Sequence, residues 1–144
     1  MVRVLLVWMS VLWVLAGCGV SEVEPETSFW EATVEPVGPD PEVSGSATGL
    51  SQPDLSQVSV TLRGADPDSR LRWHVREGDC SQDGDAVASP GGFPILEVGA
   101  EGSATGTGTF GTRLRTSQRY AVEIFLDSAN EDLRLACGTL ISDS

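Results

Sequence analysis

The sequence predicts an all-β fold, a single antiparallel β-sandwich or barrel. From about Gly45 onward, apolar and polar residues alternate in short segments that glycine, aspartate, serine and proline separate, as in strands joined by turns. No segment of this region repeats its apolar residues at the 3.6-residue period of an amphipathic helix. We therefore assign residues 45–144 to one β domain.

The predicted strands follow one another at short intervals. They lie at residues 57–63, 69–77, 93–98, 103–110, 119–126 and 133–141, with a turn at residues 99–102 between the third and fourth. The alternation is clearest in the second strand, where Leu71, Trp73 and Val75 share one face. Such a face predicts a strand with one side in the core and the other in solvent.

The first residues resemble the signal peptide of bacterial lipoproteins. Arg3 precedes the uncharged residues 4–15, and the run Leu15-Ala16-Gly17-Cys18 is similar to the lipobox of that class. The resemblance implies that residues 1–17 are removed and that the Cys18 sulfur receives a diacylglycerol. An ordinary secretory signal, in which Cys18 has no role, is the alternative. Because a spanning helix needs about 20 apolar residues, we expect a lipid anchor in the bacterial cell envelope.

Residues 18–44 are predicted to be the lipidated cysteine and an acidic, proline-rich tether. Residues 19–44 contain seven acids, four prolines and no basic residue. Such a composition buries too little apolar surface to become ordered. Residues 29–34 alternate weakly, so an edge strand or a contact with the domain is the alternative for that stretch. Gly19, in place of aspartate, favours the outer membrane over the inner one in a cell that has both.

The charge balance limits the partners. The chain has 21 acidic and 9 basic residues, and it has no lysine. Nucleic-acid binding relies on clustered basic side chains that neutralise phosphates, so the composition argues against nucleic acid. An acidic surface also repels anionic lipid headgroups. We therefore expect membrane attachment through the lipid alone, and a protein or small molecule as the ligand.

The chain has three cysteines. With Cys18 assigned to lipid, Cys80 and Cys137 remain as a pair. Outside the cytoplasm such a pair is expected to form a disulfide, with two buried free thiols as the alternative.

Two stretches are similar to copper/zinc superoxide dismutases. Residues 133–138, Leu-Arg-Leu-Ala-Cys-Gly, resemble the late strand of that family, in which an arginine precedes a disulfide-bonded cysteine by three residues. Residues 73–79, Trp-His-Val-Arg-Glu-Gly-Asp, resemble its strand with a His-x-His copper motif. The resemblance implies a Greek-key sandwich or barrel, with Cys80 in the disulfide loop. It also implies that Arg134 matches the arginine that guides the anionic substrate.

Most metal ligands of that family are missing here. His74 is the only histidine, Arg76 stands at the second position of the motif, and the strand with Glu123 brings no copper ligand. A redox copper centre needs about three or four nitrogen or sulfur ligands. The sequence therefore predicts no dismutase activity and no cofactor. The alternative is a degenerate dismutase-like protein that binds one copper or zinc ion through His74. A further resemblance, to the chordin-type repeat domain, implies an extracellular binding role.

Two groups of charged residues are candidate sites. A cationic stripe is predicted on the face of residues 69–77 opposite the apolar one: Arg70, Arg72, His74 and Arg76. It forms either a candidate anion or partner face or a solvated, salt-bridged face. The loop that follows holds Asp79, Asp83 and Asp85, weak candidates for calcium because this ion prefers carboxylate oxygens. We expect a noncatalytic, lipid-anchored β module whose ligand the sequence does not identify.

Overall fold

The computed structural model describes residues 26–38, 41–127 and 133–143, together with residues 19 and 23. The strands in these residues are β1 (Ser28–Pro36), β2 (Ser44–Gln52), β3 (Leu55–Arg63), β4 (Arg70–Glu77), β5 (Leu96–Glu97), β6 (Ala104–Phe110), β7 (Tyr120–Leu126) and β8 (Arg134–Asp143). A short 3-10 turn, η1 (Pro90–Gly92), precedes β5. The predicted signal peptide and Cys18 lie outside the described residues.

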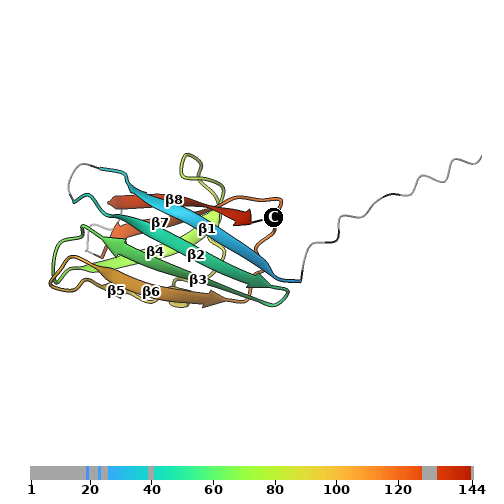
Figure 1. Cartoon of the computed structure of the whole chain (residues 1–144), viewed down its shortest axis with the longest axis horizontal. Helices are drawn as coiled ribbons and strands as arrows, with labels where there is room; N and C mark the ends of the chain where they lie inside the picture. The colour runs from blue at the N-terminus through green and yellow to red at the C-terminus, as the bar shows by residue number, and fades with distance from the viewer. Residues whose placement is uncertain (1–18, 20–22, 24–25, 39–40, 128–132, 144) are drawn as a thin grey trace, which may run out of the picture.

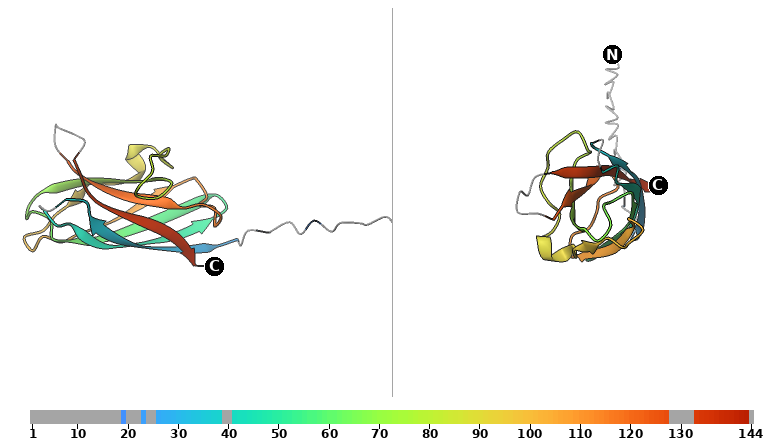
Figure 2. Two further views of the ribbon diagram at one scale, coloured as in Figure 1. Left: turned by 90° about the horizontal axis from the view of Figure 1, so that it is seen from above. Right: turned by 90° about the vertical axis from the view of Figure 1, so that its left-hand side faces the viewer.

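All eight strands belong to one antiparallel sheet in the order β5-β4-β7-β8-β1-β2-β3-β6. The sheet curls until its two edges meet, which gives a nearly closed barrel (Figures 1 and 2). The predicted all-β, antiparallel architecture is confirmed. Among the described residues, no helix has the length and apolar character that a membrane crossing requires.

The barrel begins earlier in the chain than predicted. Residues 28–36 were assigned to the tether, but they form β1, which pairs with β2 on one side and β8 on the other. Trp30, Ala32 and Val34 point into the core, and the acidic residues Glu31 and Glu35 point outward. A strand needs apolar residues only at alternate positions, so the outward acids made this segment look disordered. The domain therefore starts at Ser28 and not at Gly45.

The predicted strand at residues 93–98 is also shorter in the structure. Only Leu96 and Glu97 form β5, which pairs with β4, while β6 pairs with β3 on the opposite edge of the sheet. Pro94 has no N–H to donate to a neighbouring strand. Its carbonyl oxygen accepts a hydrogen bond from the Trp73 indole at 2.9 Å. The two segments thus flank the seam of the barrel without forming a hairpin.

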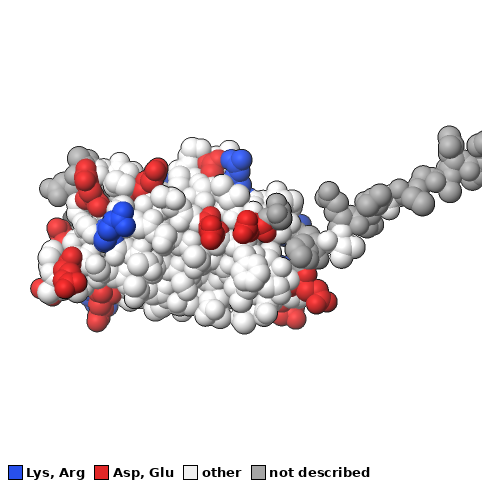
Figure 3. All heavy atoms as spheres, viewed as in Figure 1, with Lys and Arg blue, Asp and Glu red and all other residues white. Residues whose placement is uncertain are grey.

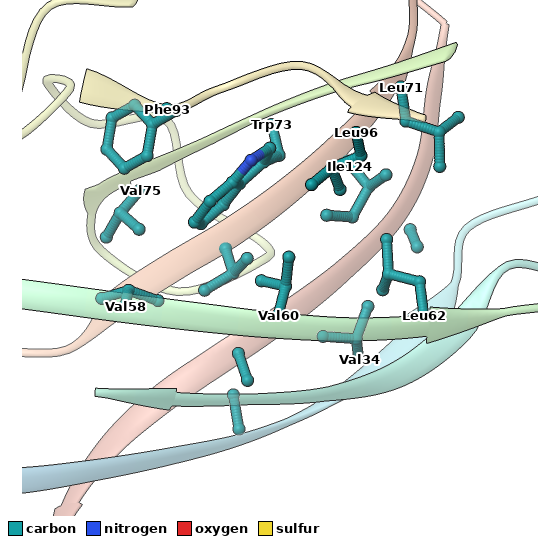
Figure 4. Close-up of a cluster of buried hydrophobic side chains, with 14 of the residues drawn as sticks. Val34, Val58, Val60, Leu62, Leu71, Trp73, Val75, Phe93, Leu96 and Ile124 are labelled. Atoms are coloured by element: carbon teal, nitrogen blue, oxygen red, sulfur yellow. The ribbon is translucent and has the colours of Figure 1, made fainter. Parts of the chain in front are cut away.

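The inward faces of the strands form one core. Figure 4 shows side chains of β3 and β4 facing each other across the interior: Val58, Val60, Leu62, Leu71, Trp73 and Val75, none of them more than 3% exposed. Aromatic pairs extend the core, with Trp30 and Tyr120 edge to face at 5.4 Å. Each such pair adds about 0.5–1.5 kcal/mol beyond the burial of its area.

Two glycines of β6 allow the barrel to close at its seam. A Cβ atom at Gly108 would lie 2.7 Å from Phe93 Cδ1 and 2.9 Å from the carbonyl oxygen of Gly92. At Gly106, a Cβ atom would overlap the side chain of Leu96. The absence of side chains at these positions lets the segment before β5 pack directly on the β6 backbone. This segment also forms a wall of a pocket on the outer surface.

Candidate functional site

The cationic stripe of β4 is divided between two carboxylates. Arg70 and Arg72 lie near Asp127, with Nε to carboxylate distances of 3.8 and 3.6 Å. His74 and Arg76 instead contact Glu123 of β7. The first pair of arginines is at the surface, whereas the Arg76 side chain is only 5% exposed. The stripe is therefore not one continuous solvated face.

Glu123 is the centre of an ionic cluster in which Glu123 and Arg76 are buried while His74 and Arg134 are about a third exposed. Its Oε1 accepts hydrogen bonds from Arg76 Nε and, at 3.0 Å, from His74 Nε2. Its Oε2 accepts a hydrogen bond from Arg134 Nη1 at 2.7 Å. Only 7% of the Glu123 side chain is exposed. We call His74, Arg76, Glu123 and Arg134 the Glu123 cluster.

Strand register and a disulfide loop assemble this cluster. His74 of β4 lies opposite Glu123 of β7, which lies opposite Cys137 of β8. The loop after β4 crosses β7 and is attached to β8 by the disulfide between Cys80 and Cys137, whose Cα atoms are 5.9 Å apart. The predicted disulfide is thus present in the structure.

The loop supplies further acceptors to the two arginines. Arg76 donates to the carbonyl oxygens of Glu77 at 3.1 Å and Asp79 at 3.0 Å, and Arg134 donates to that of Cys80 at 3.3 Å. Charged groups are costly to bury unless they are paired and hydrogen-bonded. Both conditions are met here, so the cluster and the loop position each other.

These contacts also set the protonation state of Glu123. Burial alone raises the pKa of its carboxyl group, but hydrogen bonds from Arg76, Arg134 and His74 outweigh burial and lower the pKa from 4.5 to about 2. Glu123 is therefore ionised at neutral pH and only accepts hydrogen bonds. It follows that His74 Nε2 carries a proton in the contact with Glu123.

The sequence did not identify Glu123 as a functional residue. The available signal was an acid between Val122 and Ile124 in an otherwise apolar strand, together with arginines on another strand. Arg76 was placed on an outward face, and it does point outward from the sheet. It is nevertheless buried, because the Cys80 loop covers it. Arg134, which the dismutase resemblance assigned to substrate guidance, is bonded to Glu123 and Cys80.

The acidic loop is not assembled into a metal site. Asp79 accepts hydrogen bonds from the Ser81 side chain and, at 2.9 Å, from its backbone N–H, and these bonds lower the pKa of Asp79. The carbonyl oxygen of Asp85 accepts the Glu77 N–H at 2.9 Å, so this part of the loop is held by its backbone. Within the described residues, no three His, Cys, Asp or Glu side chains are grouped so that they could hold a metal ion.

Hollows on the outer surface of the described residues include a groove and a smaller pocket. A shallow groove of about 940 Å³ runs over β1, β2 and β8 beside the disulfide, and its charged lining residues are Glu31, Glu35 and Asp143. The surface over β1, β2 and β3 is largely uncharged with scattered acids (Figure 3). A smaller pocket of about 250 Å³ lies beside the Glu123 cluster, where Arg72 and His74 meet apolar side chains. Arg72 and His74, the two central residues of the cationic stripe, thus line this smaller pocket.

No family model matches this chain, and no curated protein matches its sequence.

Proposed function

We propose that the protein is a lipid-anchored module of the bacterial cell envelope that binds a ligand or partner through its barrel and catalyses no reaction. The observation that supports a noncatalytic role is that Glu123 accepts three hydrogen bonds within the protein. Both of its oxygens accept hydrogen bonds from arginines, and the only histidine of the chain is bound to the same carboxylate. The two buried charged side chains of the described residues, Arg76 and Glu123, are thus engaged with each other, which is typical of a structural role.

The proposed barrel is of the Greek-key, dismutase-like type. In support, the chain leaves β3, forms β4 and β5, and returns as β6 beside β3, before β7 pairs back with β4. A Greek key is defined by such returns of a later strand to an earlier one. The disulfide between Cys80 and Cys137 joins the elements that the dismutase resemblance implies.

The donor set does not fit the copper or zinc of that family. At the second position of the resembling copper motif stands Arg76, and its guanidinium is bound to Glu123. A guanidinium has no lone pair to offer a metal and stays protonated in proteins. His74 would have to leave Glu123 and find ligands elsewhere. We therefore favour the binding module over a dismutase-like protein with one ion on His74.

The proposed anchor places the barrel close to the membrane. β1 begins at Ser28, and β8 ends beside it, with Phe29 opposite Asp143. Ten peptide steps separate Cys18 from Ser28, and such a length spans at most about 35 Å when fully extended. The start of β1 is therefore held within about 35 Å of the proposed lipid. The outer membrane is the proposed location in a cell with two membranes.

Replacing Cys18 by serine is expected to abolish lipidation. The intact mass of the membrane-extracted wild type should correspond to a chain that starts at Cys18 and carries lipid, because the thiolate is the acceptor of the diacylglycerol. Cys18→Ser should retain residues 1–17 and carry no lipid. Ser21→Ala, a change in the same segment that leaves the lipobox intact, is the matched control and should behave as the wild type. Normal maturation and membrane partitioning of Cys18→Ser would overturn the anchor.

A further inference from the structure

We propose that the pocket beside the Glu123 cluster binds small carboxylates that carry an aromatic or branched apolar group. This inference rests on the proposed binding function and specifies its ligand class. The pocket lies on the outer face of the sheet, between β4, β7 and the segment that runs from the Cys80 loop to β5. Its floor includes Trp73 and Phe93, which also belong to the hydrophobic core.

The walls of the pocket select for an apolar body. They are formed by Trp73, Ala86, Ala88, Pro90, Phe93, Ile95 and Phe125. The volume of about 250 Å³ is slightly below the range of pockets that hold drug-sized ligands. A molecule of about ten non-hydrogen atoms, such as one ring with a short acidic chain, is of suitable size.

The charged side chain in the lining of the pocket is a cation. It belongs to Arg72, and no acidic side chain lines the pocket. His74 lies in the same lining with its Nε2 bound to Glu123. Such a lining is unusual on a chain with a net charge of −12, and the larger groove over β1 and β8 shows the opposite pattern, with acids and no arginine. An ammonium or neutral polar ligand would find no acidic partner in this lining.

Arg72 is held in a position suited to a carboxylate. Its guanidinium lies over the Phe125 ring, 6.0 Å from the centroid, and Asp127 approaches its Nε at 3.6 Å. The His74 ring also packs against Phe125, with centroids 5.1 Å apart. A guanidinium presents a planar fork of five N–H donors, which matches the two oxygens of a carboxylate. An incoming carboxylate would bind Arg72 while its apolar group rests on Phe125.

The binding of phenylacetate to the full chain in detergent micelles tests this inference. We expect saturable NMR shifts at Ala86, Ala88 and Ile95, with a Kd of about 1 mM or lower for a ligand of this size. The neutral isostere 2-phenylethanol should bind at least about tenfold more weakly, because it lacks the charge-assisted hydrogen bonds to Arg72. Acetate, which lacks the ring, should show no saturable shift at these residues.

Arg72→Gln and Arg70→Gln form a matched pair of variants. Both remove one positive charge from the same face of β4 and one partner of Asp127, but only Arg72 lines the pocket. Arg72→Gln should weaken phenylacetate binding at least about tenfold, whereas Arg70→Gln should leave it unchanged. Dispersed spectra of both variants establish that they fold.

Three results would overturn the inference: equal binding of the alcohol and the acid, equal loss in both variants, or no saturable shift with phenylacetate. Its failure is distinguishable from failure of the proposed function. If Cys18 carries lipid and phenylacetate does not bind, only the ligand class is wrong. If Cys18 carries no lipid and phenylacetate binds, the anchor is wrong and the pocket remains.

Discussion

Replacement of Glu123 by glutamine is expected to destabilise the barrel by about 3 to 5 kcal/mol, the usual cost of removing one partner from a buried ion pair. The change leaves the positive charge of Arg76, which is 5% exposed, without its counter-ion. It also weakens the charge-assisted hydrogen bond from Arg134. The free energy of unfolding in urea, measured for wild type and variant at pH 7, gives this difference directly.

Glu77→Gln is the control for the loss of a negative charge. Glu77 lies at the end of β4 and is exposed, so its replacement should change the stability by no more than about 0.5 kcal/mol. Equal stabilities of the Glu123 and Glu77 variants would contradict a structural role for the cluster.

The low pKa of Glu123 predicts that the folded protein loses stability in acid. The pKa of Glu123 is lower in the folded protein, about 2, than its ordinary value of 4.5. The unfolded chain therefore takes up this proton first, and protonation favours unfolding. The stabilisation from Glu123 is complete above about pH 4.5 and is lost as the pH falls towards 2. In Glu123→Gln this contribution should be missing from the pH dependence of stability.

Replacement of Cys80 and Cys137 by serine is expected to cost about 4 kcal/mol, because a long loop gains entropy in the unfolded chain. The two cysteines are 57 residues apart in the sequence. The loop would also lose its attachment over Arg76 and Glu123. Thermal unfolding, compared with that of Cys18→Ser, measures the effect of the pair, since Cys18→Ser removes a cysteine that precedes β1 in the sequence and should leave the unfolding temperature of the barrel unchanged. Unfolding temperatures that agree in the two variants would contradict the stabilising role of the disulfide.

Several strands of the barrel were predictable because one face of each is buried and the other is not. At Leu71, Trp73 and Val75 the two-residue period is strong enough to predict β4 on its own. At Trp30, Ala32 and Val34 the same period was present, but the acids between these residues dominated the composition. Composition averages over both faces of a strand. The composition of residues 28–36 therefore did not indicate that they form β1.

The candidate site was less predictable because it depends on long-range pairing. Glu123 meets His74 and Arg76 through the pairing of β4 with β7, across 49 and 47 residues of sequence. Neither the alternation of apolar residues nor the spacing of the strands along the sequence specifies which strands become neighbours in the sheet. The disulfide was predictable from the even pair of cysteines left after Cys18, but the covering of Arg76 by the Cys80 loop was not.

We propose that the Glu123 cluster occupies, with its own charges, the place where the dismutase resemblance implies copper. The most direct test is the metal content of the full chain, extracted from membranes of cells supplied with copper and zinc. We predict no stoichiometric copper or zinc in the wild type, and no change in His74→Ala. One copper or zinc ion per wild-type chain, lost in His74→Ala, would contradict the claim.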